Sequence, residues 1–194
     1  MRLFIGIDLD DDARQAIAAE QKRLKAAVGD DRSALRWIRP EHMHLTLAFL
    51  GELDDRLAQS VVETIGQPVQ ADRFPVVFGG LGVFPSGGAP RVLWLGLKAG
   101  SREVIGVQRE VAERVTGLGI ALEQRPFHPH LTLARWRTPR PSDRRLVATA
   151  DSPRDIARIE VQQVSLIQSR LSPAGPTYVS LTHSPLSSGR LGES

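Results

Sequence analysis

The chain has 194 residues, of which 41% are hydrophobic, enough for one substantial core or for two small lobes that share an interface. It contains no cysteine, which excludes disulfides, thiolate metal sites and cysteine nucleophiles and indicates a reducing, cytosolic compartment. Its 25 basic and 22 acidic residues give a net charge of +3. This balance does not favour a protein that coats nucleic acid without sequence preference.

A strand and a helix are predicted first. The short apolar run "RLFIGID" (2–8) is broken by Asp8, and no cleavage-site pattern follows it, so it predicts a strand and no signal peptide. Asp10–Asp12 then stand where a helix N-cap and first turn favour carboxylates, ahead of a helix over 13–28. Nowhere is an apolar stretch long enough to cross a membrane, and no membrane partner is expected.

The middle of the chain alternates strands and helices. The patterns predict a strand over 35–38, a histidine-containing strand over 42–51, a helix over 54–66, strands over 74–84 and 91–98, and a helix over 101–117. The glycine-rich turn over 85–90 lacks the spacing of a phosphate-binding loop and is interpreted as a hairpin connection.

The last third begins with a second histidine-containing strand and is otherwise extended. Its predicted elements are strands over 128–136, 158–171 and 177–183, with a Pro-rich loop and a short helical stretch after the first. The small, polar segment 186–194 is predicted to be a flexible tail. So many adjacent strands argue against a doubly wound parallel sheet and favour an α+β fold with mainly antiparallel sheets.

The two histidine strands indicate an internal repeat. Both contain His-Leu-Thr-Leu, and their second histidines, His44 and His130, are 86 residues apart, close to half the chain. We therefore expect a single bilobal domain over 1–185, in which two lobes are related by a pseudo-twofold axis and enclose a central cleft.

Alternation within the first histidine strand assigns its side chains to two faces. Leu45, Leu47 and Phe49 should point one way, and His44 and Thr46 the other. With five histidines and eight threonines in the chain, chance would place a threonine two residues after a histidine about 0.2 times. The sequence does so twice.

Paired imidazoles suit a reaction in which one proton is removed and another delivered, because an imidazole titrates near neutral pH and serves as acid or base. A threonine two residues along the same face offers a hydroxyl for an oxyanion, so two copies can hold a phosphate from both sides. Neither histidine strand contains a serine, and the chain has no cysteine. Direct attack by water, or by a hydroxyl of the substrate, is the simplest mechanism.

Several segments resemble one enzyme family. "RPEHMHLTLAFLGE", "PFHPHLTLAR" and "SRLSPAGPTY", together with the opening "RLFIGIDL" and "RVLWLGL", are similar to the RNA 2′,3′-cyclic phosphodiesterases of the 2H phosphoesterase superfamily. The similarity spans nearly the whole chain. It implies that His44 is the proton donor, that His130 is the proton acceptor, and that Thr46 and Thr132 hold the phosphate.

Arg135 matches an arginine that some members of this family use near the phosphate. Strict alternation would place it with Leu131 and Leu133, on the face away from His130. Either the strand ends or bulges before Arg135, or this side chain lies on a solvated rim.

The resemblance implies a metal-independent enzyme without a cofactor, monomeric, that converts the 2′,3′-cyclic phosphate of an RNA end or nucleotide into a 2′-phosphomonoester. Reversible 2′-5′ RNA ligation is the expected side reaction. Two alternatives keep the fold: another cyclic or 2′-5′ nucleotide as substrate, or a non-catalytic module that binds RNA ends.

A further alternative is a metal protein with four histidine ligands. His42 and His128 precede the two candidate catalytic histidines by two residues, and each resulting His-x-His pair can chelate zinc from one face of a strand. The family resemblance instead makes both of them variable rim positions. His183 has no recognisable partner in the sequence and is assigned a structural or surface role.

Overall fold

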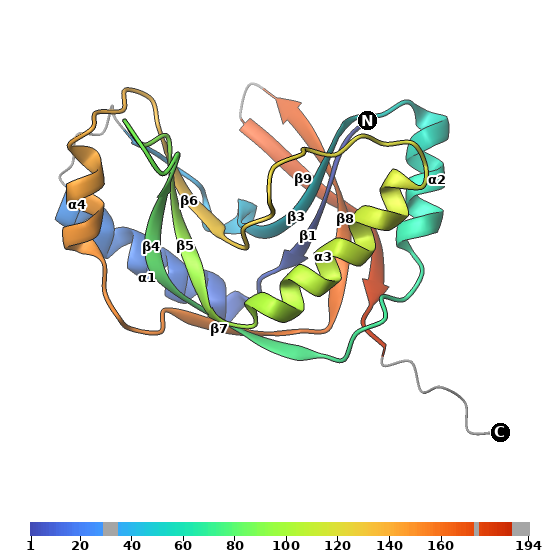
Figure 1. Cartoon of the computed structure of the whole chain (residues 1–194), viewed down its shortest axis with the longest axis horizontal. Helices are drawn as coiled ribbons and strands as arrows, with labels where there is room; N and C mark the ends of the chain where they lie inside the picture. The colour runs from blue at the N-terminus through green and yellow to red at the C-terminus, as the bar shows by residue number, and fades with distance from the viewer. Residues whose placement is uncertain (29–34, 173–174, 188–194) are drawn as a thin grey trace.

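The computed structural model describes residues 1–28, 35–172 and 175–187 (Figure 1). Its helices are α1 (Asp11–Val28), α2 (Asp55–Ile65), α3 (Ser101–Thr116) and α4 (Asp143–Ala150), with a 3₁₀ turn, η1, at Pro40–His42. Its strands are β1 (Arg2–Asp8), β2 (Leu35–Trp37), β3 (His44–Glu52), β4 (Phe74–Phe84), β5 (Val92–Ala99), β6 (Leu131–Trp136), β7 (Ala157–Val161), β8 (Gln163–Ser172) and β9 (Gly175–Pro185).

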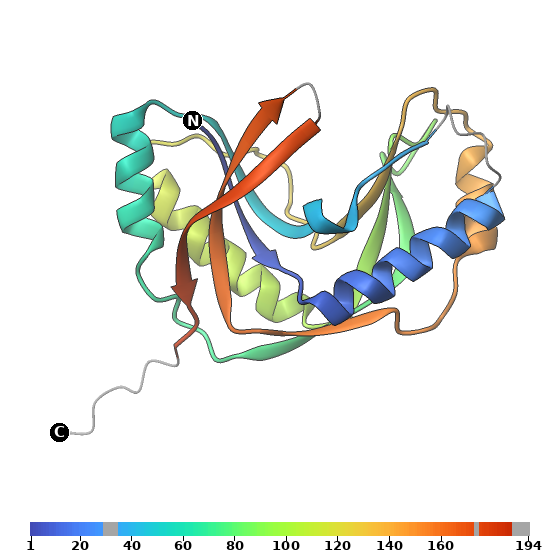
Figure 2. The ribbon, with the colours of Figure 1, turned by 180° about the vertical axis from the view of Figure 1, so that it is seen from behind.

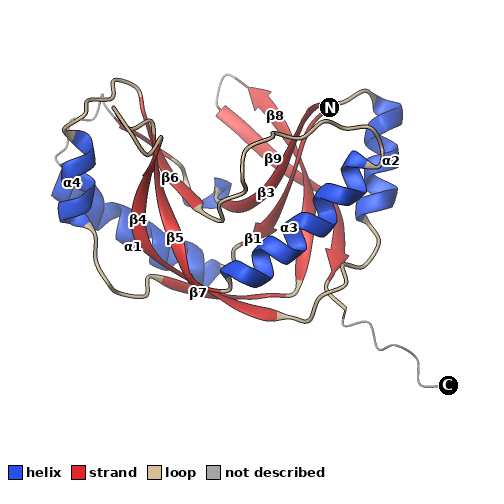
Figure 3. Cartoon of the chain, in the orientation of Figure 1, coloured by secondary structure: helices blue, strands red, loops and turns tan. Residues whose placement is uncertain are grey.

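The strands form two sheets, one of four strands in the order β3-β1-β8-β9 and one of five in the order β2-β6-β5-β4-β7. Neighbouring strands are antiparallel in both sheets. The predicted α+β class with antiparallel sheets is confirmed. Figure 3 displays the two sheets splaying apart from the centre of the molecule, with the helices on the outside.

The long helices link the two sheets. Helix α1 follows β1 of the four-stranded sheet but packs against β7 of the other, and α3 follows β5 of the five-stranded sheet but packs against β3. Figure 2 displays α1 running beside the five-stranded sheet. Each sheet is therefore covered by a helix that follows, along the chain, a strand of the other sheet.

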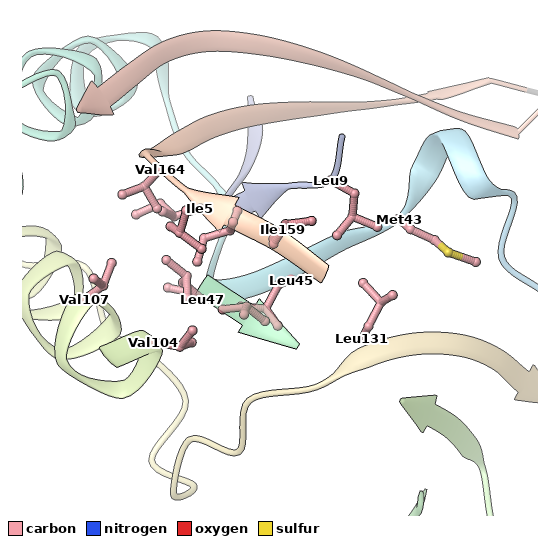
Figure 4. Close-up of a cluster of buried hydrophobic side chains, with 14 of the residues drawn as sticks. Ile5, Leu9, Met43, Leu45, Leu47, Val104, Val107, Leu131, Ile159 and Val164 are labelled. Carbon is pink, nitrogen blue, oxygen red and sulfur yellow. The ribbon is translucent and has the colours of Figure 1, made fainter. Parts of the chain in front are cut away.

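The core is continuous from one sheet to the other. Apolar side chains of both sheets and of the helices form a single buried cluster, to which Leu45 of β3 and Leu131 of β6 belong (Figure 4). The two sheets therefore share one hydrophobic core. No helix within the described residues is long and apolar enough to span a membrane.

The internal repeat is visible in the strand pairing. Strand β1 leads through α1 to the histidine strand β3, which pairs antiparallel with β1. Strand β5 leads through α3 to the second histidine strand β6, which pairs antiparallel with β5. The two histidine motifs therefore occupy equivalent positions in the two sheets.

Both histidine strands begin later than the alternation predicts. The first starts at His44, because Pro40 begins a 3₁₀ turn that contains His42. The second starts only at Leu131. Its two histidines flank Pro129, which has no N–H to donate to a β-ladder and so keeps this segment out of the sheet.

The prediction that Phe49 shares a face with Leu45 and Leu47 is wrong. In the ladder with β1, Ile5 pairs with Ala48 and Gly6 with Thr46, so Leu47 is an extra residue. A β-bulge of this kind reverses the alternation beyond it. Phe49 is consequently 64% exposed and lies on the same face as His44 and Thr46.

The predicted strand over 158–171 is in fact two strands that belong to different sheets. Strand β7 ends at Val161 and β8 begins at Gln163, and no glycine or proline marks the passage between them. Residues 173–174 of the predicted connection to the last strand, and 188–194 of the predicted tail, lie outside the described residues. Leu186, at the start of that tail, is buried and forms an isolated bridge with Val69.

Candidate active site

The two histidine motifs lie at the centre of the molecule, where β3 and β6 contact each other (Figure 1). Leu45 and Leu131, each directly after a candidate catalytic histidine, face into the shared core. His44 and His130 thus stand at the start of two neighbouring strands that belong to different sheets.

The two imidazoles are held in the same way. Nδ1 of His44 lies 3.2 Å from the backbone oxygen of His42, and Nδ1 of His130 lies 2.7 Å from that of His128. A carbonyl oxygen can only accept a hydrogen bond, so Nδ1 is the protonated nitrogen in both rings. Neither Nε2 is bound by the backbone, and in both motifs the acceptor for Nδ1 is the backbone of the residue two positions earlier.

His44 is surrounded by a polar network that the sequence did not indicate. Its Nε2 lies 3.3 Å from Oδ1 of Asp8, its Cα partner in the β1–β3 ladder. Oδ2 of Asp8 accepts a hydrogen bond from the buried hydroxyl of Ser165, which lies 2.9 Å from Nδ1 of His183. His183, assigned above to structure or surface, is therefore connected to His44 through two residues.

The carboxylate of Asp8 is suited to remain charged. Burial raises the pKa of Asp8, but the hydrogen bonds of His44 and Ser165 and the positive charges of His44 and Arg14 together lower it below its ordinary value. A negative charge therefore lies beside Nε2 of His44. Strand β5, which takes the place of β1 in the other half, contains no acidic residue.

His130 has an apolar and cationic environment instead. Its ring lies edge-on to Phe84, with centroids 5.0 Å apart, and 6.1 Å from the indole of Trp94. Burial is the main cause that lowers the pKa of His130 below 6.5, and the charges of His128 and Arg135 also lower it, whereas the hydrogen bond that Nδ1 donates to the backbone oxygen of His128 raises it. His130 is therefore predominantly neutral at pH 7, with an unprotonated Nε2.

Thr46 and Thr132 lie on the histidine faces of their sheets. Thr46 forms a cross-strand row with Gly6, Ser165 and His183, and both threonines are partly exposed. In the described part of the chain, neither hydroxyl has a hydrogen-bond partner in the protein. Both are free to bind a ligand.

Arg135 reaches the histidine face because β6 is bulged. Leu93 pairs with Ala134 and Trp94 with Thr132, so Leu133 is an extra residue, as Leu47 is in β3. Arg135 is exposed on the side of Thr132 rather than on that of the buried leucines, and its charge acts on His130. Of the alternatives that the sequence left open for Arg135, the structure therefore shows the bulge.

Helix α1 fixes the segments that carry both motifs. Arg14 donates hydrogen bonds to the backbone oxygens of Pro40 and Met43, in the segment that leads into His44. The buried amide of Gln21 donates to the backbone oxygen of Leu133, at the bulge of β6. One helix therefore positions the starting segment of β3 and the bulge of β6.

The four histidines of the motifs do not form a common ligand set. His42 lies edge-on to Tyr178, and His128 packs against Phe84 and Trp94. Among the described residues, which include every histidine of the chain, no three His, Asp or Glu side chains are grouped to hold a metal ion.

Relatives that share one name match this chain over most of its length. A relative from Archaeoglobus fulgidus, named RNA 2′,3′-cyclic phosphodiesterase, is 33% identical over 181 residues, which cover 93% of this chain and 98% of that protein. A relative of the same name from Aeropyrum pernix is 32% identical over 172 residues, which cover 87% and 97%.

Solved structures share the fold over nearly the full length. The protein TT0787 of Thermus thermophilus superimposes with a TM-score of 0.73 at 28% identity, covering 98% of this chain and all of the other. Escherichia coli LigT complexed with 3′-AMP gives a TM-score of 0.70 at 26% identity, covering 95% and 97%. The family model described as the 2′-5′ RNA ligase superfamily matches residues 9–172. This chain is therefore a member of the 2′-5′ RNA ligase superfamily, a group of 2H phosphoesterases.

Proposed function

We propose that this protein is an RNA 2′,3′-cyclic phosphodiesterase that hydrolyses the cyclic phosphate at the end of an RNA, or of a nucleotide, without a metal ion. The names of its relatives support the substrate class. One observation carries the mechanism: two equivalent His-x-Thr units have opposite electrostatic surroundings. Asp8 lies beside Nε2 of His44, whereas burial keeps His130 neutral.

These surroundings support His130 as the base and His44 as the acid. His130 accepts a proton through Nε2 from a water molecule, whose oxygen attacks phosphorus. The bond from phosphorus to the ribose 3′ oxygen breaks, and His44 delivers the proton from its Nε2 to that oxygen. The product is a 2′-phosphomonoester with a free 3′ hydroxyl. Thr46, Thr132 and Arg135 bind the phosphate oxygens.

Asp8 positions the proton donor. The backbone oxygen at Nδ1 and the carboxylate of Asp8 at Nε2 fix the orientation of the His44 ring. The two halves of the molecule contain the same motif, so Asp8 distinguishes the acid from the base.

The same arrangement supports ligation. By microscopic reversibility, His44 can remove the proton of a 3′ hydroxyl next to a 2′-phosphodiester, and His130 can protonate the departing 5′ oxygen. In the forward direction, a 5′ hydroxyl of a second RNA takes the place of water and a 2′-5′ linkage forms. Weak ligation should therefore accompany hydrolysis.

The pH dependence of kcat/KM should be bell-shaped, because one histidine must be neutral and the other protonated in the same molecule. The acidic limb reports the base, and the lowered pKa of His130 places this limb below pH 6.5. Initial rates with 2′,3′-cyclic AMP between about pH 4 and pH 10 measure both limbs. A rate that does not vary across neutral pH would contradict the acid–base pair.

Thr46→Val and Thr132→Val should each lower kcat/KM by about ten- to hundredfold, because each loses one hydrogen bond to a charged phosphate and keeps the β-branched shape. Steady-state kinetics with 2′,3′-cyclic AMP measure the effect. Thr182→Val, an exchange on β9 outside the proposed phosphate site, is the matched control. Wild-type kinetics in both motif variants would restrict the two threonines to a structural role in their strands.

The proposed function is tested by incubating the purified protein with 2′,3′-cyclic AMP, with and without EDTA. We expect equal turnover in both. Loss of activity on chelation that zinc restores would favour the metal alternative. Binding without turnover would favour the non-catalytic module, and turnover of only a 2′-5′ oligoadenylate or another cyclic nucleotide would reassign the substrate.

A further inference from the structure

Two arginines stand opposite each other on neighbouring strands of the five-stranded sheet. Arg36 of β2 and Arg135 of β6 are Cα partners in an antiparallel ladder, so both side chains project from the same face. Both are exposed, and within the described residues neither forms an ion pair or a hydrogen bond with the protein. Directly opposed like charges destabilise a sheet, and an anion bound between the two side chains would relieve this repulsion.

The arginines continue a row of residues that crosses four strands. Phe84 of β4 pairs with Val92 of β5, Val92 pairs with Arg135, and Arg135 pairs with Arg36. The neighbouring row contains Thr132, which pairs with Trp94. The two rows are two residues apart on β5, or about 7 Å. The arginine row therefore lies directly beside the proposed phosphate site.

Aromatic rings accompany the arginines on this face. Phe84 and Trp94 are both partly exposed, with ring centroids 5.2 Å apart. Trp94 lies over Gly82, its Cα partner on β4, where a side chain of any size would collide with the indole. Guanidinium groups next to aromatic faces are typical of surfaces that bind single-stranded nucleic acid, where phosphates meet cations and bases stack on rings.

We propose that Arg36, which stands beside Arg135 at the reacting phosphate, binds a phosphodiester of the RNA chain upstream of the terminal cyclic phosphate, and that the partly exposed rings of Phe84 and Trp94 stack on its bases. This subsite rests on the proposed function and refines its substrate: the enzyme prefers an RNA end to a cyclic mononucleotide. A mononucleotide has no second phosphate for Arg36 to bind.

The test compares two substrates in the Arg36→Gln variant. We expect the ratio of kcat/KM for a short RNA with a 2′,3′-cyclic phosphate end to that for 2′,3′-cyclic AMP to fall about tenfold or more, for one lost charged contact. The slope of log kcat/KM for the RNA against log salt should decrease by about 0.7. Arg158→Gln, which removes an exposed arginine of β7, should leave the ratio and the slope unchanged.

The melting temperature of Arg36→Gln should equal or exceed that of the wild type, because the substitution relieves the repulsion from Arg135. An unchanged ratio would overturn the subsite, and so would an equal loss on both substrates. If the wild type hydrolyses neither substrate, the proposed function fails, and binding of a 3′-phosphorylated RNA still decides the subsite by fluorescence anisotropy. Equal affinity of wild type and Arg36→Gln would then contradict it.

Discussion

Replacing either His44 or His130, the proposed acid and base, with asparagine should lower kcat by about 10²–10⁴-fold, the usual contribution of one general acid or base. Asparagine is the preferred substitution because its amide can still donate to the backbone oxygen that Nδ1 contacts in His44 and His130. Alanine would also remove packing, since the side chain of His44 is only 8% exposed and lies against Phe4 and Tyr178. Single-turnover rates with 2′,3′-cyclic AMP measure the loss.

His183→Asn is the matched control, because it exchanges a histidine of the same face that the mechanism does not use for proton transfer. Its kcat should stay within a few-fold of the wild type. Circular dichroism and the melting temperature establish that each variant is folded. A folded variant of His44 or His130 with wild-type turnover would remove that residue from the mechanism.

Asp8→Asn should lower kcat by about ten- to hundredfold, because it weakens a charged contact that orients the ring of His44. Asparagine keeps an oxygen near Nε2 of His44 but removes the negative charge. The acidic limb, which reports His130, should stay in place. The pH dependence of kcat/KM for wild type and variant separates the two limbs.

Asp12→Asn provides the control for a lost carboxylate, because Asp12 is exposed in the first turn of α1. It should leave both limbs unchanged. Wild-type kcat in a folded Asp8→Asn variant would contradict the role of Asp8 in positioning His44. Ser165→Ala should lower kcat less than Asp8→Asn, because it removes only a hydrogen bond to the carboxylate.

Much of the fold is encoded locally and was predictable. The strands expected over 2–8 and 74–84 have the same bounds as β1 and β4, because continuous apolar runs between turn residues identify buried strands. Asp10 caps α1 as expected, with Oδ1 accepting a hydrogen bond from the backbone N–H of Ala13. The repeated His-Leu-Thr-Leu also indicated two equivalent halves.

The features that the sequence did not predict depend on strand pairing. The bulges at Leu47 and Leu133 exist only relative to the partner strands β1 and β5, and they bring Phe49 and Arg135 to the histidine faces. Asp8 ends a strand that has no local relation to His44. Strands β7 and β8 are likewise separate because they pair with strands of different sheets. No residue at the boundary between them indicates this change.

The most direct test of the account is the product formed from an RNA that ends in a 2′,3′-cyclic phosphate, with EDTA present throughout. If His44 protonates the 3′ oxygen while His130 activates water, the RNA should end in a 2′-phosphate with a free 3′ hydroxyl. Digestion to mononucleotides and chromatography against authentic 2′- and 3′-phosphorylated standards identify the end. A predominant 3′-phosphate, a mixture of both isomers, or an unchanged cyclic end would contradict the account.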